Sequence, residues 1–132
     1  MIETFDIAGY TRISVDDELD RDNVSIENQK AIIRDFVKQR FPGSSLTFFE
    51  DRDRSGYTFE QREGYQEMRR GLMAHKYDIL LVKDFSRFSR RNSRGLVELE
   101  DLRDAGVRII SIGDSIDYPT YDDWTAIQFR FL

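Results

Sequence analysis

The 132-residue sequence predicts a three-layer α/β domain, in which a mainly parallel central sheet of four or five strands is flanked by helices. Two observations predict this fold. Segments rich in β-branched and aromatic residues alternate with segments of helical periodicity in the order βαβαβαβα, which is typical of parallel α/β folds. The third strand segment also contains the run Ile79–Val82, which is apolar on both faces, as expected of a strand buried inside a parallel sheet.

The first half of the chain contains two predicted strands around one helix. Residues 4–13 form a strand, because apolar and polar residues alternate there. Ser25 is a suitable N-cap for a helix over residues 25–41, and the Pro-Gly pair that follows ends it. The second strand covers residues 46–49, and we expect residues 50–59 to form a polar loop.

The second half continues the alternation. Apolar residues three and four apart predict a helix over residues 62–75, and the apolar run places the third strand at residues 77–83. A leucine-rich helix over residues 95–104 precedes a glycine and a fourth strand at residues 107–112, and another helix begins at Trp124. Ligands of such sheets bind beyond the carboxyl ends of the strands, so three loops are expected to converge. These loops cover residues 14–23, 51–62 and 84–94.

The composition excludes several classes of site. The chain has no cysteine and one histidine, His75, so it has no thiol nucleophile, no cysteine-ligated zinc and no multi-histidine metal site. His75 lies near a predicted helix end, where we expect a surface or capping role. The chain begins without the features of a signal peptide and has no apolar run of the ~18 residues that a membrane span needs. We therefore expect a cytoplasmic domain.

One short basic segment stands out in an acidic chain. The net charge of the chain is −5, yet residues 83–94 contain five basic residues against one acidic residue. Arg87 and Arg90 are three residues apart, so on a helical turn they would share a face and could clamp a phosphate. The alternative is a solvated basic loop, and the charge segregation favours the anion site.

A second candidate site lies at the end of the first strand. Arg12 and Ser14 are two residues apart, so both side chains point to the same side of an extended strand. A hydroxyl beside a guanidinium can attack a phosphate, because the arginine stabilises the alkoxide and the developing charge. Taken alone, the same short pattern also fits a strand-end serine with a surface salt bridge.

Two further loops have simpler explanations. The stretch from Asp51 through Ser55 to Gly56 fits a capped turn. Arg62 is the one residue of this loop that a capped turn does not explain. The acidic residues between 16 and 27 match the spacing of a calcium loop, but Arg21 stands where that loop requires glycine, so calcium is rejected.

Taken together, these motifs resemble the catalytic domain of serine recombinases, the resolvase/invertase superfamily. The resemblance covers nearly the whole chain and is closest to the large serine recombinases of phages and conjugative transposons, in which a serine often stands at the position of Ser86. The motifs are Tyr10-x-Arg12-x-Ser14, Ser25-Ile26-x-x-Gln29, Ser55-Gly56, Arg62-x-Gly64 and Val82-Lys83-Asp84-Phe85-Ser86-Arg87-x-x-Arg90.

The resemblance implies a site-specific DNA recombinase that works without metal or cofactor. Ser14 would attack the scissile phosphate to give a 5′-phosphoserine intermediate, and Arg12, Arg87 and Arg90 would surround that phosphate. Supporting positions would be Tyr10, Gln29, Asp51, Ser55, Arg62 and Ser86. The partners implied are double-stranded DNA, a homodimer at each site and a synaptic homotetramer, with no membrane, in a protein encoded by a bacterium or a mobile element.

The apolar residues at the end of the chain lead us to expect a domain, residues 1–132, that is truncated before a long dimerisation helix and DNA-binding domains. Such a fragment would fold but would not recombine DNA by itself.

Two other functions stay open from the sequence. One is a non-catalytic α/β module that binds phosphate or regulates, and the other is a metal-dependent phosphoesterase that uses Asp16, Asp51 and Asp84.

Overall fold

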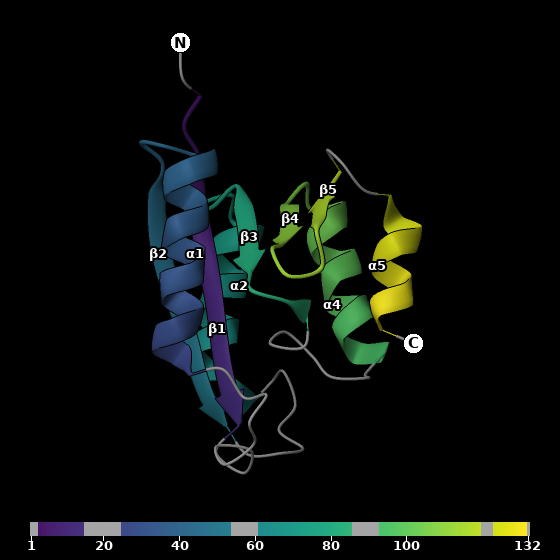
Figure 1. The fold of residues 1–132 in the computed structure, drawn as a ribbon. Helices are drawn as coiled ribbons and strands as arrows, with labels where there is room; N and C mark the ends of the chain where they lie inside the picture. The colour runs from purple at the N-terminus through teal and green to yellow at the C-terminus, as the bar shows by residue number, and fades with distance from the viewer. Residues whose placement is uncertain (1–2, 15–24, 54–60, 86–92, 120–122, 132) are drawn as a thin grey trace.

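A computed structural model describes residues 3–14, 25–53, 61–85, 93–119 and 123–131 of the chain. Its described elements are five strands and four helices, and they form a single sheet with helices on both faces (Figure 1). In chain order they are β1 (Asp6–Ser14), α1 (Ile26–Arg40), β2 (Ser45–Asp53), α2 (Glu63–Met73), β3 (Ile79–Val82), α4 (Ser93–Asp104), β4 (Arg108–Ser111), β5 (Ile116–Tyr118) and α5 (Trp124–Arg130).

The strand order across the sheet is β2-β1-β3-β4-β5. The first four strands are parallel, with Gly9 opposite both Phe48 and Leu81, whereas β5 returns antiparallel to β4. This topology confirms the predicted α/β fold and places the carboxyl ends of β1, β2 and β3 at one edge.

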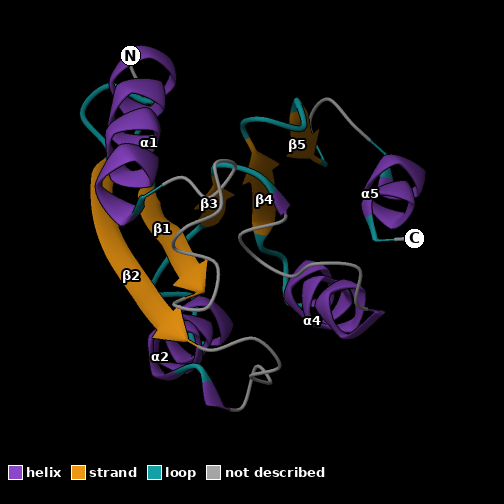
Figure 2. Cartoon of the chain, turned by 60° about the horizontal axis from the view of Figure 1, so that its bottom comes forward, coloured by secondary structure: helices purple, strands orange, loops and turns teal. Residues whose placement is uncertain are grey.

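Two apolar clusters hold the three layers together. On one face of the sheet, α1 packs its apolar stripe, centred on Ile33 and Val37, against Ile7, Ile79 and Leu81. Helices α2, α4 and α5 lie on the other face (Figure 2). They cover a larger cluster of buried side chains. The members of this cluster that lie on strands are Ala8, Tyr10, Phe49, Leu80, Val82, Ile109 and Ile116. All four residues of β3 are buried, as the apolar run predicted.

Both ends of α1 follow the predicted signals. Ser25 caps α1, and its hydroxyl accepts a hydrogen bond from the Asn28 N–H at 3.1 Å. Asp123 caps α5 in the same way, through the Ala126 N–H at 3.1 Å. At the end of α1, Gly43 adopts φ 84°, which glycine tolerates at a helix terminus.

Two predictions about the sheet need correction. The second strand does not end at Phe49 but continues to Asp53, because the charged residues after Phe49 extend the ladder with the end of β1. The predicted polar loop over residues 50–59 is therefore wrong for its first four positions. The sequence analysis named four strand segments, and none of them corresponds to β5. With β5 the sheet has five strands, which agrees with the expected four or five.

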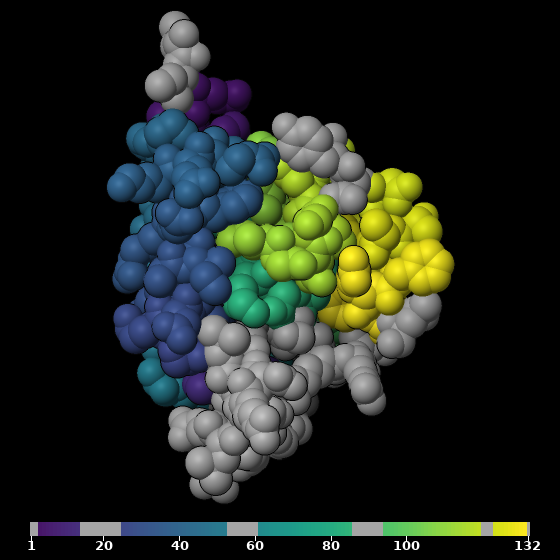
Figure 3. All heavy atoms as spheres, in the orientation of Figure 1, coloured from purple at the N-terminus to yellow at the C-terminus, as the bar shows by residue number. Residues whose placement is uncertain are grey.

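The two faces of the sheet are covered unequally. Helix α1 lies over β1 and its neighbours, whereas the surface of β4 and β5 is visible between α1 and α5 in Figure 3. A shallow depression of about 320 Å³ lies there, with Phe36 and Arg40 of α1 on one side and Ile110, Ile116 and Asp117 on the other. In the described part of the chain, no helix is long and apolar enough to cross a membrane.

Candidate active site

The first two strands extend beyond the third at the edge where the candidate residues gather. Pairing between β1 and β3 ends at Tyr10 and Val82, whereas β1 stays paired with β2 until Ser14 lies opposite Asp53. Tyr10 is buried on the α2 face of the sheet. Arg12, two residues further along β1, is half-buried, and the Ser14 side chain lies outside the described part of the structure.

Gln29 of α1 replaces the missing strand neighbour of Arg12. Its side-chain oxygen accepts a hydrogen bond from the Arg12 N–H at 3.1 Å, and its side-chain nitrogen donates to the Arg12 carbonyl oxygen at 2.9 Å. Gln29 is completely buried, so both bonds are shielded from water. The backbone two residues before Ser14 is therefore held in an extended conformation after β3 has ended.

Asp51 connects the ends of β1 and β2 with the start of α2. Its carboxylate accepts hydrogen bonds from the Gly64 N–H at 2.9 Å, the Tyr65 N–H at 2.9 Å and the Tyr10 hydroxyl at 2.8 Å. The first turn of α2 approaches β2 so closely that a Cβ on Gly64 would overlap the Glu50 carbonyl oxygen. The negative charge of Asp51 also suits the positive end of the helix dipole.

These contacts correct the expected capped turn at Asp51. Asp51 lies within β2 and caps α2 from outside that helix, and Arg62 is the N-cap residue directly before α2. Arg62 is buried. Tyr10, Arg12, Gln29, Asp51 and Arg62 thus lie near one another at this end of the sheet.

Burial and a neighbouring carboxylate change the acidity of the two tyrosines in this cluster. The pKa of Tyr10 is raised well above its ordinary value, mainly because burial disfavours the phenolate and also because Asp51 is close. Arg62 and Arg12 oppose this shift, so their positive charges also reach the Tyr10 ring. Burial and Glu98 likewise raise the pKa of Tyr65 far above its ordinary value.

We expect the folded protein to release fewer than six phenolic protons before it unfolds in alkali, since it has six tyrosines. In the unfolded chain the tyrosine hydroxyls lose their protons at about pH 10. In the folded protein Tyr10 and Tyr65 keep their protons to higher pH. The contribution of these two tyrosines to the free energy of unfolding should therefore be constant below about pH 10 and decrease above it. Absorbance at 295 nm and urea unfolding at several pH values measure both effects. Tyr10→Phe and Tyr65→Phe should each make the fall shallower, and an unchanged slope in both would contradict the assignment.

A second group of polar residues, which the sequence analysis missed, continues from this cluster. Tyr65 donates a hydrogen bond to Glu98 of α4 at 2.6 Å, and Arg69 donates to the same carboxylate at 3.0 Å. The Tyr65 ring also packs edge-on against Tyr10, with the ring centres 5.8 Å apart. The sequence does contain one sign of this group. Glu98 and Leu102 are four residues apart, so the carboxylate lies on the same inner face of the helix as the leucine.

The basic segment begins at the carboxyl end of β3. Phe85 is buried there, and its N–H donates to Asp114 at 2.9 Å. Lys83 pairs with Asp84 at 3.0 Å. Four of the predicted site residues that come from loops lie outside the described residues, namely Ser55, Ser86, Arg87 and Arg90. The same holds for Asp16 and the other residues of the rejected calcium pattern up to Asp22.

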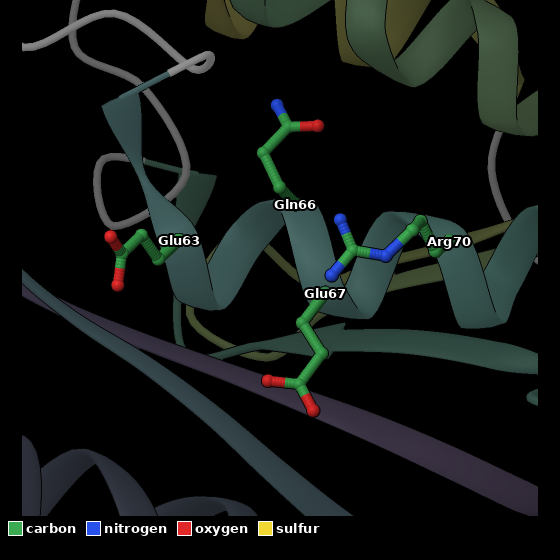
Figure 4. Close-up of a pocket in the computed structure, with 4 residues that line it drawn as sticks. All are labelled: Glu63, Gln66, Glu67 and Arg70. Atoms are coloured by element: carbon green, nitrogen blue, oxygen red, sulfur yellow. The ribbon is translucent and has the colours of Figure 1, made fainter.

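The surface beside the start of α2 is acidic. Depressions of about 540 and 570 Å³ lie there, and both include Glu63 and Glu67. Figure 4 shows these side chains projecting from successive turns of α2 together with Gln66 and Arg70. Glu50 and Asp51 add two further carboxylates to one of them. Carboxylates therefore outnumber the two guanidiniums, Arg52 and Arg70, that line these depressions.

Other candidates are not brought into the cluster. His75 is exposed at the far end of α2, in the left-handed conformation with φ 60°, and its N–H donates to the Leu72 carbonyl oxygen, as the expected surface role requires. Among the described residues, no three histidines or carboxylates are grouped so that they could hold a metal ion. Both oxygens of Asp51 already accept hydrogen bonds, which argues against its use as a metal ligand.

Fold and cluster together define an α/β domain whose candidate polar residues lie at the carboxyl ends of parallel strands. Residues 7–130 match the family model described as "Resolvase, N terminal domain". The chain belongs to this family, which comprises the catalytic domains of serine recombinases. No match was found among curated proteins.

Solved structures agree with this assignment. The N-terminal catalytic domain of TP901-1 integrase is 23% identical, with a TM-score of 0.74 over 94% of this chain and 87% of that chain. A resolvase family site-specific recombinase from Streptococcus pneumoniae is 27% identical, with a TM-score of 0.73 over 96% of this chain and 83% of that chain. The catalytic domain of ISC1926 TnpA, an IS607-like serine recombinase, is 21% identical, with a TM-score of 0.61 over 80% and 69% of the two chains.

Proposed function

We propose that this domain cuts and rejoins DNA through a phosphoserine bond at Ser14. The Ser14 hydroxyl gives up its proton as its oxygen bonds to the scissile phosphorus. The bond from phosphorus to the 3′ oxygen breaks, and that oxygen takes up a proton to leave as a 3′-hydroxyl. Attack by a 3′-hydroxyl on the phosphoserine then restores the diester and the serine. One bond replaces another at each step, so no ATP is consumed.

The observation that carries this proposal is the rigid frame around the residues just before Ser14. Gln29 fixes the Arg12 backbone on one side, and Asp51 fixes Tyr10 and the start of α2 on the other. A nucleophile on a strand held in this way is oriented in advance, which lowers the entropic cost of attack. Arg12, with Arg87 and Arg90 from the basic segment, would neutralise the phosphate in place of a metal ion. Ser55, Arg62 and Ser86 would support them.

The proposed reaction also determines how many copies of the protein must act together. Exchange of double strands at two sites requires four breaks, hence four copies of Ser14. A dimer on each double-stranded DNA site and a tetramer at synapsis provide them, and a symmetric homo-oligomer is the usual way to repeat one active site. We therefore propose DNA and further copies of the protein as its partners.

Covalent capture tests the proposal and identifies the DNA target in the same experiment. The complete protein is incubated with fragmented genomic DNA of its source organism and stopped with detergent, and the protein-bound DNA is collected on a glass-fibre filter and sequenced. A duplex of the enriched sequence is then used for all further assays. After protease and nuclease digestion, we expect a nucleotide mass on the peptide that contains Ser14.

Two controls separate this mechanism from the alternatives. Ser14→Ala should retain no DNA on the filter, and the parent protein should retain the same amount with and without a metal chelator. A nucleotide on a tyrosine or on another serine would overturn the role of Ser14. Cleavage that is lost with chelator would favour a metal-dependent phosphoesterase, and a parent protein that retains no DNA would favour a non-catalytic module.

A further inference from the structure

A polar side chain is buried away from the cluster of Tyr10, Arg12, Gln29, Asp51 and Arg62. It is the carboxylate of Glu98. Its side chain is 7% exposed, and it lies on α4 among Leu96, Leu99 and Leu102, where an apolar residue would be expected. It accepts hydrogen bonds from Tyr65 at 2.6 Å and from Arg69 at 3.0 Å, both on α2. Burying a carboxylate is costly, and apolar replacements of buried ion pairs are often neutral or stabilising. A stability requirement therefore does not account for Glu98.

The partners of Glu98 lead directly to the strand ends. Tyr65 is completely buried, and its N–H donates to the same Asp51 oxygen that accepts the Tyr10 hydroxyl. A continuous series of contacts thus runs from Tyr10 through Asp51 and Tyr65 to Glu98. At its far end it fixes α4, because hydrogen bonds prescribe a direction and a distance that apolar packing does not.

The position of α4 matters because of what precedes it in the sequence. The helix begins at Ser93, three residues after Arg90. The other end of that segment, Phe85, is held separately, through its N–H to Asp114 and its ring against Phe131 at 5.4 Å between centres. In the sequence, Arg87 and Arg90 therefore lie between Phe85, which is held by Asp114, and α4, which Glu98 bonds to α2.

We infer that Glu98 is a positioning residue for the DNA-cutting reaction, which acts through Tyr65 and Arg69 to hold α4 in register with α2, Asp51 and the end of β1. This inference rests on the function proposed above for Ser14. Glu98 itself lies in the interior between α2 and α4 and touches no substrate. Its effect is on geometry, and a displacement of about 1 Å in an active site can cost about 10²-fold in rate.

The chain offers a matched set of variants. Tyr65→Phe with Glu98→Met replaces the buried polar pair by apolar side chains of similar size, and Glu98→Gln keeps an acceptor for Tyr65. Asp101→Asn is the control, because Asp101 lies on the same helix and binds the same Arg69 at 3.2 Å, but is exposed and does not reach Tyr65.

Two readouts on the complete protein test the inference. Without DNA, we expect the apolar double variant to keep the urea midpoint of the parent while amide hydrogen exchange across Ser93–Asp104 becomes about tenfold faster. With the captured duplex, its cleavage rate should fall by about tenfold to 10²-fold, with an unchanged dissociation constant. Glu98→Gln should recover most of the rate, and Asp101→Asn should behave as the parent in both assays.

The outcomes separate this inference from the proposed function. Parent-like exchange or parent-like cleavage in the double variant would overturn the role of Glu98, as would an equal loss in Asp101→Asn. A matching fall in urea midpoint and cleavage rate would reduce Glu98 to a structural residue. Failure of the parent itself to form the Ser14 adduct would instead overturn the phosphoserine mechanism, whatever the exchange data show.

Discussion

Replacing Arg12, Arg87 or Arg90 by alanine should slow cleavage of the captured duplex by about 10²-fold or more, which is the usual cost of losing one donor to a developing negative charge. Affinity for the same duplex should change far less. The domain carries a net charge of −5, so one guanidinium contributes little to the overall attraction of DNA. Single-turnover cleavage rates and binding isotherms at one salt concentration measure the two effects separately.

Arg70 provides the matched control for these arginines. It is exposed on the outer, acidic side of α2, and Arg70→Ala should cleave and bind like the parent. Arg12→Lys is the conservative variant, and it should recover only part of the rate, because an ammonium cannot bind two phosphate oxygens in the fork geometry of a guanidinium. If binding and cleavage fall by the same factor in the alanine variants, these arginines are anchoring contacts and not part of the reaction.

Most of the fold could be predicted because its strands and helices have strong local signals. The uniformly apolar run Ile79–Val82 predicted the central strand, and Ser25 predicted the start of α1. The end of β2 could not be predicted, because Glu50 to Asp53 has the composition of a loop and is extended only through pairing with β1. Strand β5 has three residues, too few for a periodicity to be visible.

The candidate site was predicted as a set of residues but not as a structure. Strand alternation placed Arg12 and Ser14 on one side of an extended strand, and the family resemblance added Gln29 and Asp51 as supporting positions. Which atoms they bond is decided by distant segments, since Gln29 and Arg12 are 17 positions apart and Asp51 and Tyr10 are 41 positions apart. Glu98 was missed because its partners lie on another helix, which periodicity within α4 does not reveal.

Asp51→Ala should lower the free energy of unfolding by about 3–5 kcal/mol, the usual cost of removing one partner from a buried charged group. The substitution removes the acceptor of three hydrogen bonds, which come from the Gly64 and Tyr65 N–H groups and the Tyr10 hydroxyl. Each unsatisfied buried donor costs about 1–3 kcal/mol. Domains of this size are stable by only about 5–15 kcal/mol, so the variant should be close to the limit of folding. Urea unfolding followed by circular dichroism measures the loss.

Graded variants show whether the loss comes from those three bonds. Tyr10→Phe removes one donor together with its bond and should cost about 1 kcal/mol. Asp51→Asn keeps one carbonyl oxygen but turns an N–H group toward the remaining donors, so its cost should fall between the other two. Asp123→Ala is the control, because Asp123 also caps a helix but is exposed, and its loss should cost about 1 kcal/mol. An Asp51→Ala cost no larger than that of Asp123→Ala would mean that water replaces the carboxylate, and that Asp51 does not hold the strand ends against α2.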